Sequence, residues 1–199
     1  NTSLFIADKS KIEKRDQYFS YSLGTFARGL WGPKYIADKC TVWSLCYENL
    51  EGYNISTVYT YELVKKGKFS FDIDNGAMFA YHNTNRNVKG DRVSNTNSTY
   101  LNLSIIPTLR IKKISDSIPV GIAYGVGLSY IFGDPSIEKP YDTPLLSEVK
   151  AEISLPLRSK SDSSLFFGLH HRCTFLGILA SNDGTTFGHH WYTFGYRYK

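Results

Sequence analysis

Apolar and polar residues alternate with a period of two along most of the chain, which is the pattern of β-strands whose two faces differ. The clearest run covers residues 165–175 and reads LFFGLHHRCTF. Runs of the same kind predict about eight strands, near residues 18–28, 53–64, 69–81, 101–111, 120–130, 148–157, 165–175 and 190–199. A polar, Asn-rich loop is expected at about residues 82–97, and no window has a helical period of comparable quality.

The order of these runs predicts an all-β fold. Strands joined by consecutive hairpins form an antiparallel up-and-down meander, and with about eight strands closure into a barrel removes the exposed edges. Residues 1–17 are polar and are expected to form an N-terminal arm, with the barrel covering residues 18–199. A single domain suits a chain of 199 residues.

Alternation alone leaves open which face of the sheet points outward. An inward apolar face gives a soluble barrel that binds a hydrophobic ligand, and an outward one gives a transmembrane barrel. Three features favour the transmembrane barrel: short and long connections alternate, the polar face mixes small residues with charges of both signs, and the apolar face is rich in Tyr. We therefore expect a barrel in a bacterial outer membrane, with both termini periplasmic and the long loops outside.

Composition further narrows the classes of protein that fit this sequence. Aromatic residues make up 15% of the chain, which favours strands, and no uninterrupted apolar run is long enough for a transmembrane helix. The net charge of +5 is scattered or placed in predicted turns, so no nucleic-acid-binding stripe is expected. Cys40 and Cys46 lie close in one connection, and their pairing is left open. The Cys and His spacings predict no metal site.

His171 and Cys173 lie two residues apart and therefore share one face of the predicted strand. One interpretation is a strand that carries an incidental His and a small hydrophobic Cys. The other is a base and a nucleophile, since His can take a proton from a thiol, which then attacks an ester carbonyl. In a transmembrane barrel this strand runs outward, so its later residues approach the outer leaflet, where the esters of glycolipids lie.

The sequence His170-His171-Arg172-Cys173, followed by a Gly/Phe-rich stretch, resembles the outer-membrane lipid A 3-O-deacylases, also called acyloxyacyl-hydrolase-like barrels. Their mark is His-x-Ser on the penultimate strand. The resemblance is specific over about the last third of the chain and architectural before it. It implies hydrolysis of an ester-linked acyl chain of lipid A, without metal or organic cofactor. The expected partners are lipopolysaccharide and outer-membrane lipids.

This chain departs from the family at two positions. Cys173 stands where the family has Ser, and His190 stands where typical members have an acid that orients the base. Asp183, in the preceding loop, is the nearest acid. The candidate catalytic residues are therefore His171, Cys173, Asp183 and His190, and a neutral His190 could accept a hydrogen bond from His171. His170 is expected to point into the barrel. An oxyanion donor is also required, and the alternatives are a backbone N–H or the side chain of Asn182.

Two other functions remain open at this stage. A barrel of the same build without catalysis would act as a structural or adhesion protein through its long loops. A soluble barrel would hold a hydrophobic ligand inside.

Overall fold

The computed structural model describes residues 15–27, 50–84, 87–88, 91–92, 96–133, 143–157, 163–173 and 189–199. These residues form strands and turns, with no helix among them. Eight long strands are β1 (Gln17–Ala27), β2 (Leu50–Lys66), β3 (Phe69–Thr84), β6 (Thr96–Ile111), β7 (Gly121–Gly133), β8 (Leu145–Pro156), β9 (Ser164–Cys173) and β10 (His189–Tyr198). Two-residue strands β4 (Asn87–Val88) and β5 (Asp91–Arg92) pair only with each other.

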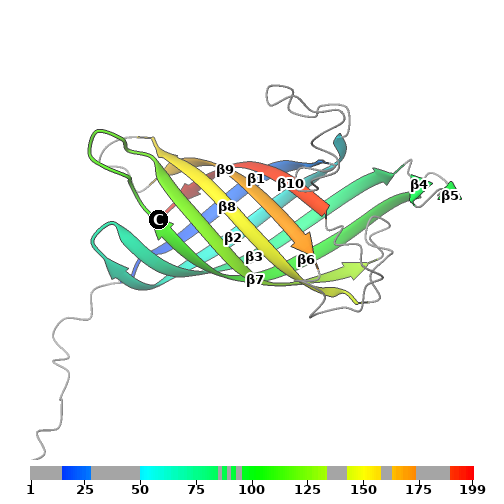
Figure 1. The fold of residues 1–199 in the computed structure, drawn as a ribbon, viewed down its shortest axis with the longest axis horizontal. Helices are drawn as coiled ribbons and strands as arrows, with labels where there is room; N and C mark the ends of the chain where they lie inside the picture. Colours follow the sequence, from blue (N-terminus) through cyan, green and yellow to red (C-terminus); the bar gives the residue numbers. More distant parts are fainter. Residues whose placement is uncertain are drawn as a thin grey trace, which may run out of the picture.

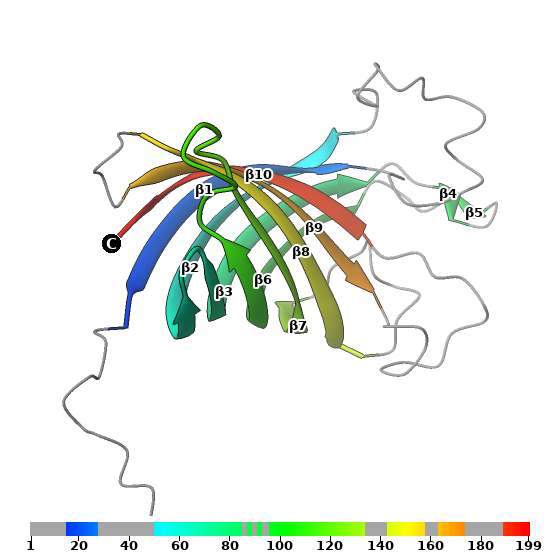
Figure 2. The same ribbon diagram turned by 60° about the vertical axis from the view of Figure 1, so that its left-hand side comes forward.

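The eight long strands close into one antiparallel barrel in the order β1-β10-β9-β8-β7-β6-β3-β2 (Figures 1 and 2). Each long strand pairs with its neighbour along the chain, and β10 returns to pair with β1. The predicted all-β, up-and-down barrel of about eight strands is therefore confirmed. The predicted loop at 82–97 was wrong at both ends, because β3 and β6 continue pairing as far as Thr84 with Thr96. Residues 1–14 lie outside the described part, so the N-terminal arm stays a prediction.

Short connections gather at one end of the barrel, together with the C-terminal residue (Figure 1). The β2–β3 hairpin turns at Gly67, whose φ of 61° favours glycine. The connections after β6 and β8 cover 112–120 and 157–163. The long connections, 28–49, 85–95, 134–144 and 174–188, leave the opposite end. We call these the short-turn end and the long-connection end.

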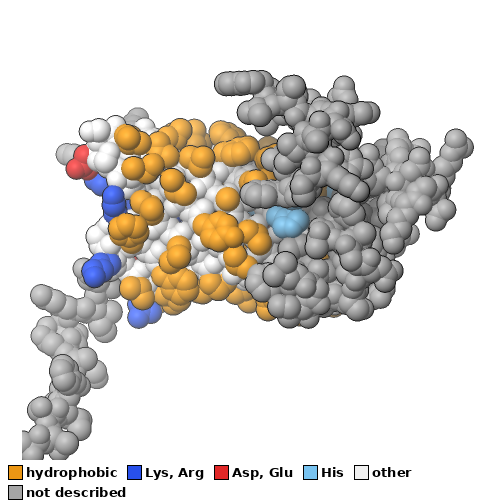
Figure 3. All heavy atoms as spheres, in the orientation of Figure 1, with side chains coloured by type: hydrophobic (Ala, Val, Ile, Leu, Met, Phe, Trp, Pro, Cys, Tyr) orange, Lys and Arg blue, Asp and Glu red, His pale blue; other side chains and the backbone are white. Residues whose placement is uncertain are grey.

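The outward faces of the strands carry a band of exposed apolar side chains (Figure 3). Its members come from every long strand and include Phe19, Leu23, Ile55, Phe71, Phe79, Leu103, Leu109, Tyr124, Ile153, Phe167 and Phe194. Most of the alternating residues between them are small or polar and are buried inside the barrel. The apolar face therefore points outward, as the connection lengths and the charges of the other face predict.

Charged side chains pair inside the barrel near the short-turn end. Glu152 on β8 accepts hydrogen bonds from Arg110 Nη1 at 2.8 Å and from Arg197 Nη1 and Nη2 at 2.5 and 2.7 Å. Asp72 binds Arg110 Nε at 2.8 Å, and Asp74 pairs with Lys150. All six side chains are almost fully buried. Burying a charge is costly unless it is paired, so each of these charges needs its partner on another strand.

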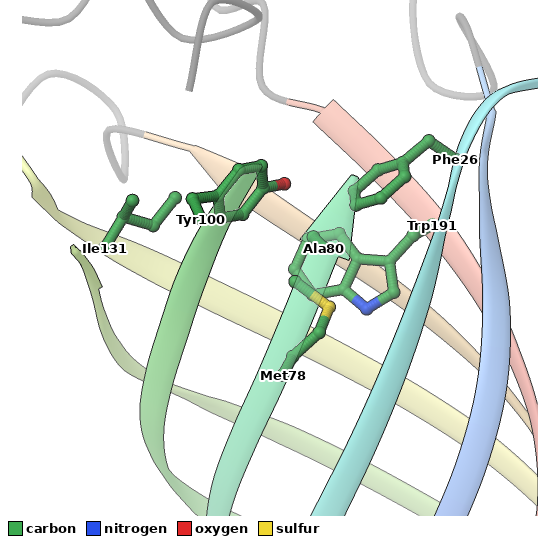
Figure 4. Close-up of a cluster of buried hydrophobic side chains, with 6 residues drawn as sticks. All are labelled: Phe26, Met78, Ala80, Tyr100, Ile131 and Trp191. Atoms are coloured by element: carbon green, nitrogen blue, oxygen red, sulfur yellow. The ribbon is translucent and has the colours of Figure 1, made fainter. Parts of the chain in front are cut away.

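An apolar cluster fills the barrel nearer the long-connection end, which the alternation had not predicted. Figure 4 shows it, and its members are Phe26, Met78, Ala80, Tyr100, Ile131 and Trp191. His82 packs within it. The centroids of the His82 and Phe26 rings are 3.7 Å apart, and His82 Nε2 lies 3.2 Å from the hydroxyl oxygen of Tyr100. The ion pairs around Glu152 thus lie towards the short-turn end, and the aromatic side chains pack towards the long-connection end.

We predict that Glu152→Gln lowers the free energy of unfolding by about 3 kcal/mol, because it leaves Arg110 and Arg197 buried beside an uncharged amide. Urea titration of the barrel refolded in lipid vesicles measures the effect. Asp116→Asn is the matched control, since Asp116 is fully exposed and pairs with Lys113 at the surface, and it should leave the unfolding curve unchanged. A Glu152→Gln variant as stable as the unmodified chain would contradict the prediction.

Candidate functional site

His171 and His190 face each other across the β9–β10 pair. Their Nδ1 atoms are 3.1 Å apart, and the rings are stacked with centroids separated by 4.4 Å. In a hydrogen bond between two imidazole nitrogens one ring donates and the other accepts, so at least one of the two rings is neutral. The expected contact between these two histidines is therefore present, while their chemical roles stay predictions.

The strand pairing places this histidine pair on the outer surface. His171 has the same strand parity as Phe167 and Leu169, and its other cross-strand neighbour is Val149 on β8. His190 shares its parity with Tyr192 and Phe194 but is only 5% exposed. The pair lies near the long-connection end, since β9 ends two residues after His171. Figure 3 shows a histidine side chain beside the apolar band at that end.

His170 points the other way, into the barrel, as predicted from the alternation. Its Nδ1 is 3.0 Å from Glu148 Oε1, and its ring stacks on Trp191 with centroids 5.1 Å apart. Glu148 also accepts a hydrogen bond from Asn102 Nδ2 at 3.0 Å. Two consecutive histidines therefore sit in different surroundings, one ionic and enclosed, the other on the outer face.

The other predicted site residues are only partly covered by the structure. Cys173 ends β9, and its backbone pairs with Ser147 on β8, but its side chain is outside the described part. Asp183, Asn182, Cys40 and Cys46 lie outside the described residues altogether. The proximity of His171 to the remaining candidates therefore rests on the sequence.

Ser147 is a polar neighbour of this site that the sequence analysis did not single out. It has the same strand parity as Val149, and its backbone pairs with Cys173. It is nevertheless only 2% exposed. Only the register between β8 and β9 brings it to the site, and no local motif in the sequence marks it.

No group of three or more His, Cys, Asp or Glu side chains among the described residues is arranged to hold a metal ion. Within the same residues there is no helix of sufficient length and apolarity to cross a membrane.

Together, the closed eight-stranded antiparallel barrel and its outward apolar band define an architecture that fits an outer-membrane protein. Comparison with protein-family models and with curated proteins finds no match for this chain. The resemblance to lipid A deacylases therefore rests on the motif around His171 and on the architecture.

We predict an interaction free energy of about 1 kcal/mol between His171 and His190, which is typical of one hydrogen bond. A double-mutant cycle of His171→Ala and His190→Ala, followed by urea unfolding in vesicles, measures it. As a control, His171→Ala is combined with Phe71→Ala on β3, on the opposite side of the barrel, where the effects should add. Additive effects for the histidine pair as well would show that the contact contributes nothing.

Proposed function

We propose that this protein is an outer-membrane esterase that removes an ester-linked acyl chain from lipid A. The observation that carries the proposal is the outward-facing His171, in contact with His190 at the edge of the apolar band. Polar groups on a lipid-facing surface are costly and are usually functional. A soluble barrel with an apolar interior is not favoured, because the charged residues lie inside and the apolar band lies outside.

His171 acts as the general base in this proposal. Its Nδ1 is engaged with His190, which leaves Nε2 as the ring atom that exchanges a proton. Strand alternation predicts Cys173 on the same face, two residues further along β9. A thiol needs less activation than a hydroxyl, so a neutral His190 in place of an acid can suffice as the group that orients the base.

The reaction proceeds in two steps. His171 takes the proton of the Cys173 thiol, the thiolate attacks the ester carbonyl, and the sugar oxygen leaves with the proton that His171 returns to it, which gives a thioester. His171 then takes a proton from water, and the resulting hydroxide attacks the thioester carbonyl. The fatty acid leaves, and the thiol regains its proton from His171. Asp183 is the candidate acid for stabilising the imidazolium from the preceding loop.

The second candidate function is a barrel that does not catalyse, with structural or adhesive long loops. Two features of the sequence favour it: Cys173 replaces the family's Ser, and His190 occupies the place of the orienting acid. Only the esterase would change the mass of lipid A, so this mass distinguishes the two functions.

Mass spectrometry of lipid A from Gram-negative cells that express the chain tests the proposal. We expect the unmodified chain to remove one hydroxyacyl group, and His171→Ala to lower the extent of removal by at least about 100-fold, the usual contribution of a general base. Cys173→Ala should abolish removal, and Cys173→Ser should retain part of it.

The matched control is His170→Gln, because His170 neighbours the proposed base but points into the barrel. It should leave deacylation intact in any preparation whose barrel is folded, as shown by heat-dependent migration in gels. Unchanged lipid A with a folded, membrane-inserted chain would overturn the esterase and leave the non-catalytic barrel. Recovery of the folded chain in the soluble fraction would overturn both.

A further inference from the structure

Basic side chains are concentrated at the short-turn end of the barrel. Seven described residues there form what we call the basic collar: Arg15, Lys65, Lys66, Lys68, Lys112, Lys113 and Lys199. The described acids near them are Asp16, Glu62 and Asp116. Figure 3 shows Lys and Arg side chains gathered where the apolar band stops.

The long-connection end has no such excess in its sequence. The connections 28–49, 85–95, 134–144 and 174–188 together contain seven Lys or Arg and seven Asp or Glu. The inward charges pair with one another. The excess of basic residues is therefore a property of one end of the barrel.

Three collar cations lie directly over aromatic rings. Arg15 is 5.8 Å from the centre of the Tyr61 ring, Lys68 is 5.8 Å from that of Phe69, and Lys112 is 5.4 Å from that of Tyr18. Aromatic rings beside cations are typical of the level at which lipid headgroups meet the acyl chains. Tyr61 and Phe69 face outward, so Arg15 and Lys68 border the apolar band where headgroups would begin. Tyr18 faces inward and holds Lys112 in the mouth of the barrel.

Part of the collar is neutralised by acids of the barrel. Asp16 pairs with Lys65 at 3.3 Å, with Lys112 at 3.1 Å and with Lys199. Burial raises the pKa of Asp16, but the hydrogen bonds from Lys199 and Lys112 outweigh burial and hold that pKa well below its usual range. Lys112 also pairs with Glu62 at 2.6 Å, so two carboxylates face three ammonium groups and leave one positive charge in excess.

The remaining collar lysines extend into solvent. Lys66 and Lys68 form no ion pair with an acid in the part of the chain that the structure covers, and Lys113 pairs only with the fully exposed Asp116. Lys68 Nζ donates a hydrogen bond to the carbonyl of Ile114 at 2.8 Å, which links the β2–β3 turn to the β6–β7 turn. This hydrogen bond therefore holds exposed lysines of the two turns at the same end of the barrel.

We propose that the basic collar binds the headgroups of anionic phospholipids, in the leaflet at the short-turn end. The proposal rests on the transmembrane barrel under Proposed function, but it does not depend on esterase activity. In outer-membrane barrels the short turns face the periplasm, where the leaflet consists of phospholipids. A basic side chain at an anionic surface increases binding about fivefold, so a few exposed lysines are enough to select the lipids around the barrel.

Spin-labelled lipids measure this selectivity directly. The full chain is refolded into phosphatidylcholine vesicles that contain traces of spin-labelled phosphatidylglycerol or spin-labelled phosphatidylcholine, and the immobilised fraction of each is compared. We expect phosphatidylglycerol to be preferred about threefold at low salt, and the preference to fall at about 0.5 M NaCl because salt screens exposed charges. The variant Lys66→Gln/Lys68→Gln/Lys113→Gln should lower the preference to about one.

The matched control is Lys34→Gln/Lys39→Gln/Lys89→Gln, which removes the same charge from the long connections and should keep the preference. If both triple variants lose the preference for phosphatidylglycerol equally, the net charge of the chain explains the preference and the collar is overturned. Insertion without any preference for phosphatidylglycerol would overturn the collar and leave the transmembrane barrel standing. A chain that does not insert into vesicles would overturn both. If the barrel shows no preference for phosphatidylglycerol and the collar binds an acidic periplasmic protein instead, the collar is a protein-binding surface and lipid binding is overturned.

Discussion

The narrow interior of an eight-stranded barrel is the constraint on which the rest of this structure depends. Eight strands enclose a space just wide enough for side chains to fill, so inward residues must fit and satisfy one another. Here the filling is ionic around Glu152 and aromatic around Trp191. Because every second residue is committed to that interior, the alternate residues must all face outward, and this produces the continuous apolar band.

The same constraint explains the position of the candidate site. Consecutive residues in a strand cannot share a face. His170 therefore points inward and contacts Glu148, while His171 points outward and contacts His190. The outer histidine pair is thus held by a rigid, fully paired sheet rather than by a loop. In the proposed esterase, this paired sheet would keep the base in place.

The two ends of the barrel carry different chemistry because they border different connections. The short-turn end has exposed lysines on its short connections, and the long-connection end has the histidine pair and balanced charge in its loops. An esterase for glycolipid and a collar for phospholipid would use opposite ends of one barrel. The two proposals are therefore independent in structure, although both need the barrel to cross a membrane.

The sequence by itself determined the strand class, the approximate number of long strands and the two faces of each strand, because a period of two assigns each residue to a face. The lengths of the connections and the charges of one face, rather than the period, indicated which face lies outside. The sequence also placed the paired charges inside and His170 apart from His171. It failed at the two ends of the predicted loop 82–97, where polar Asn and Thr residues resemble a loop although backbone pairing continues to Thr84 and Thr96. Only the tertiary structure decided the register between strands. That register brings His190 to His171 and Ser147 beside Cys173, and it gathers Phe26, Tyr100 and Trp191 from three strands into one cluster. Such contacts join residues far apart in the chain, and alternation carries no information on which residue of a strand lies opposite which residue of the next.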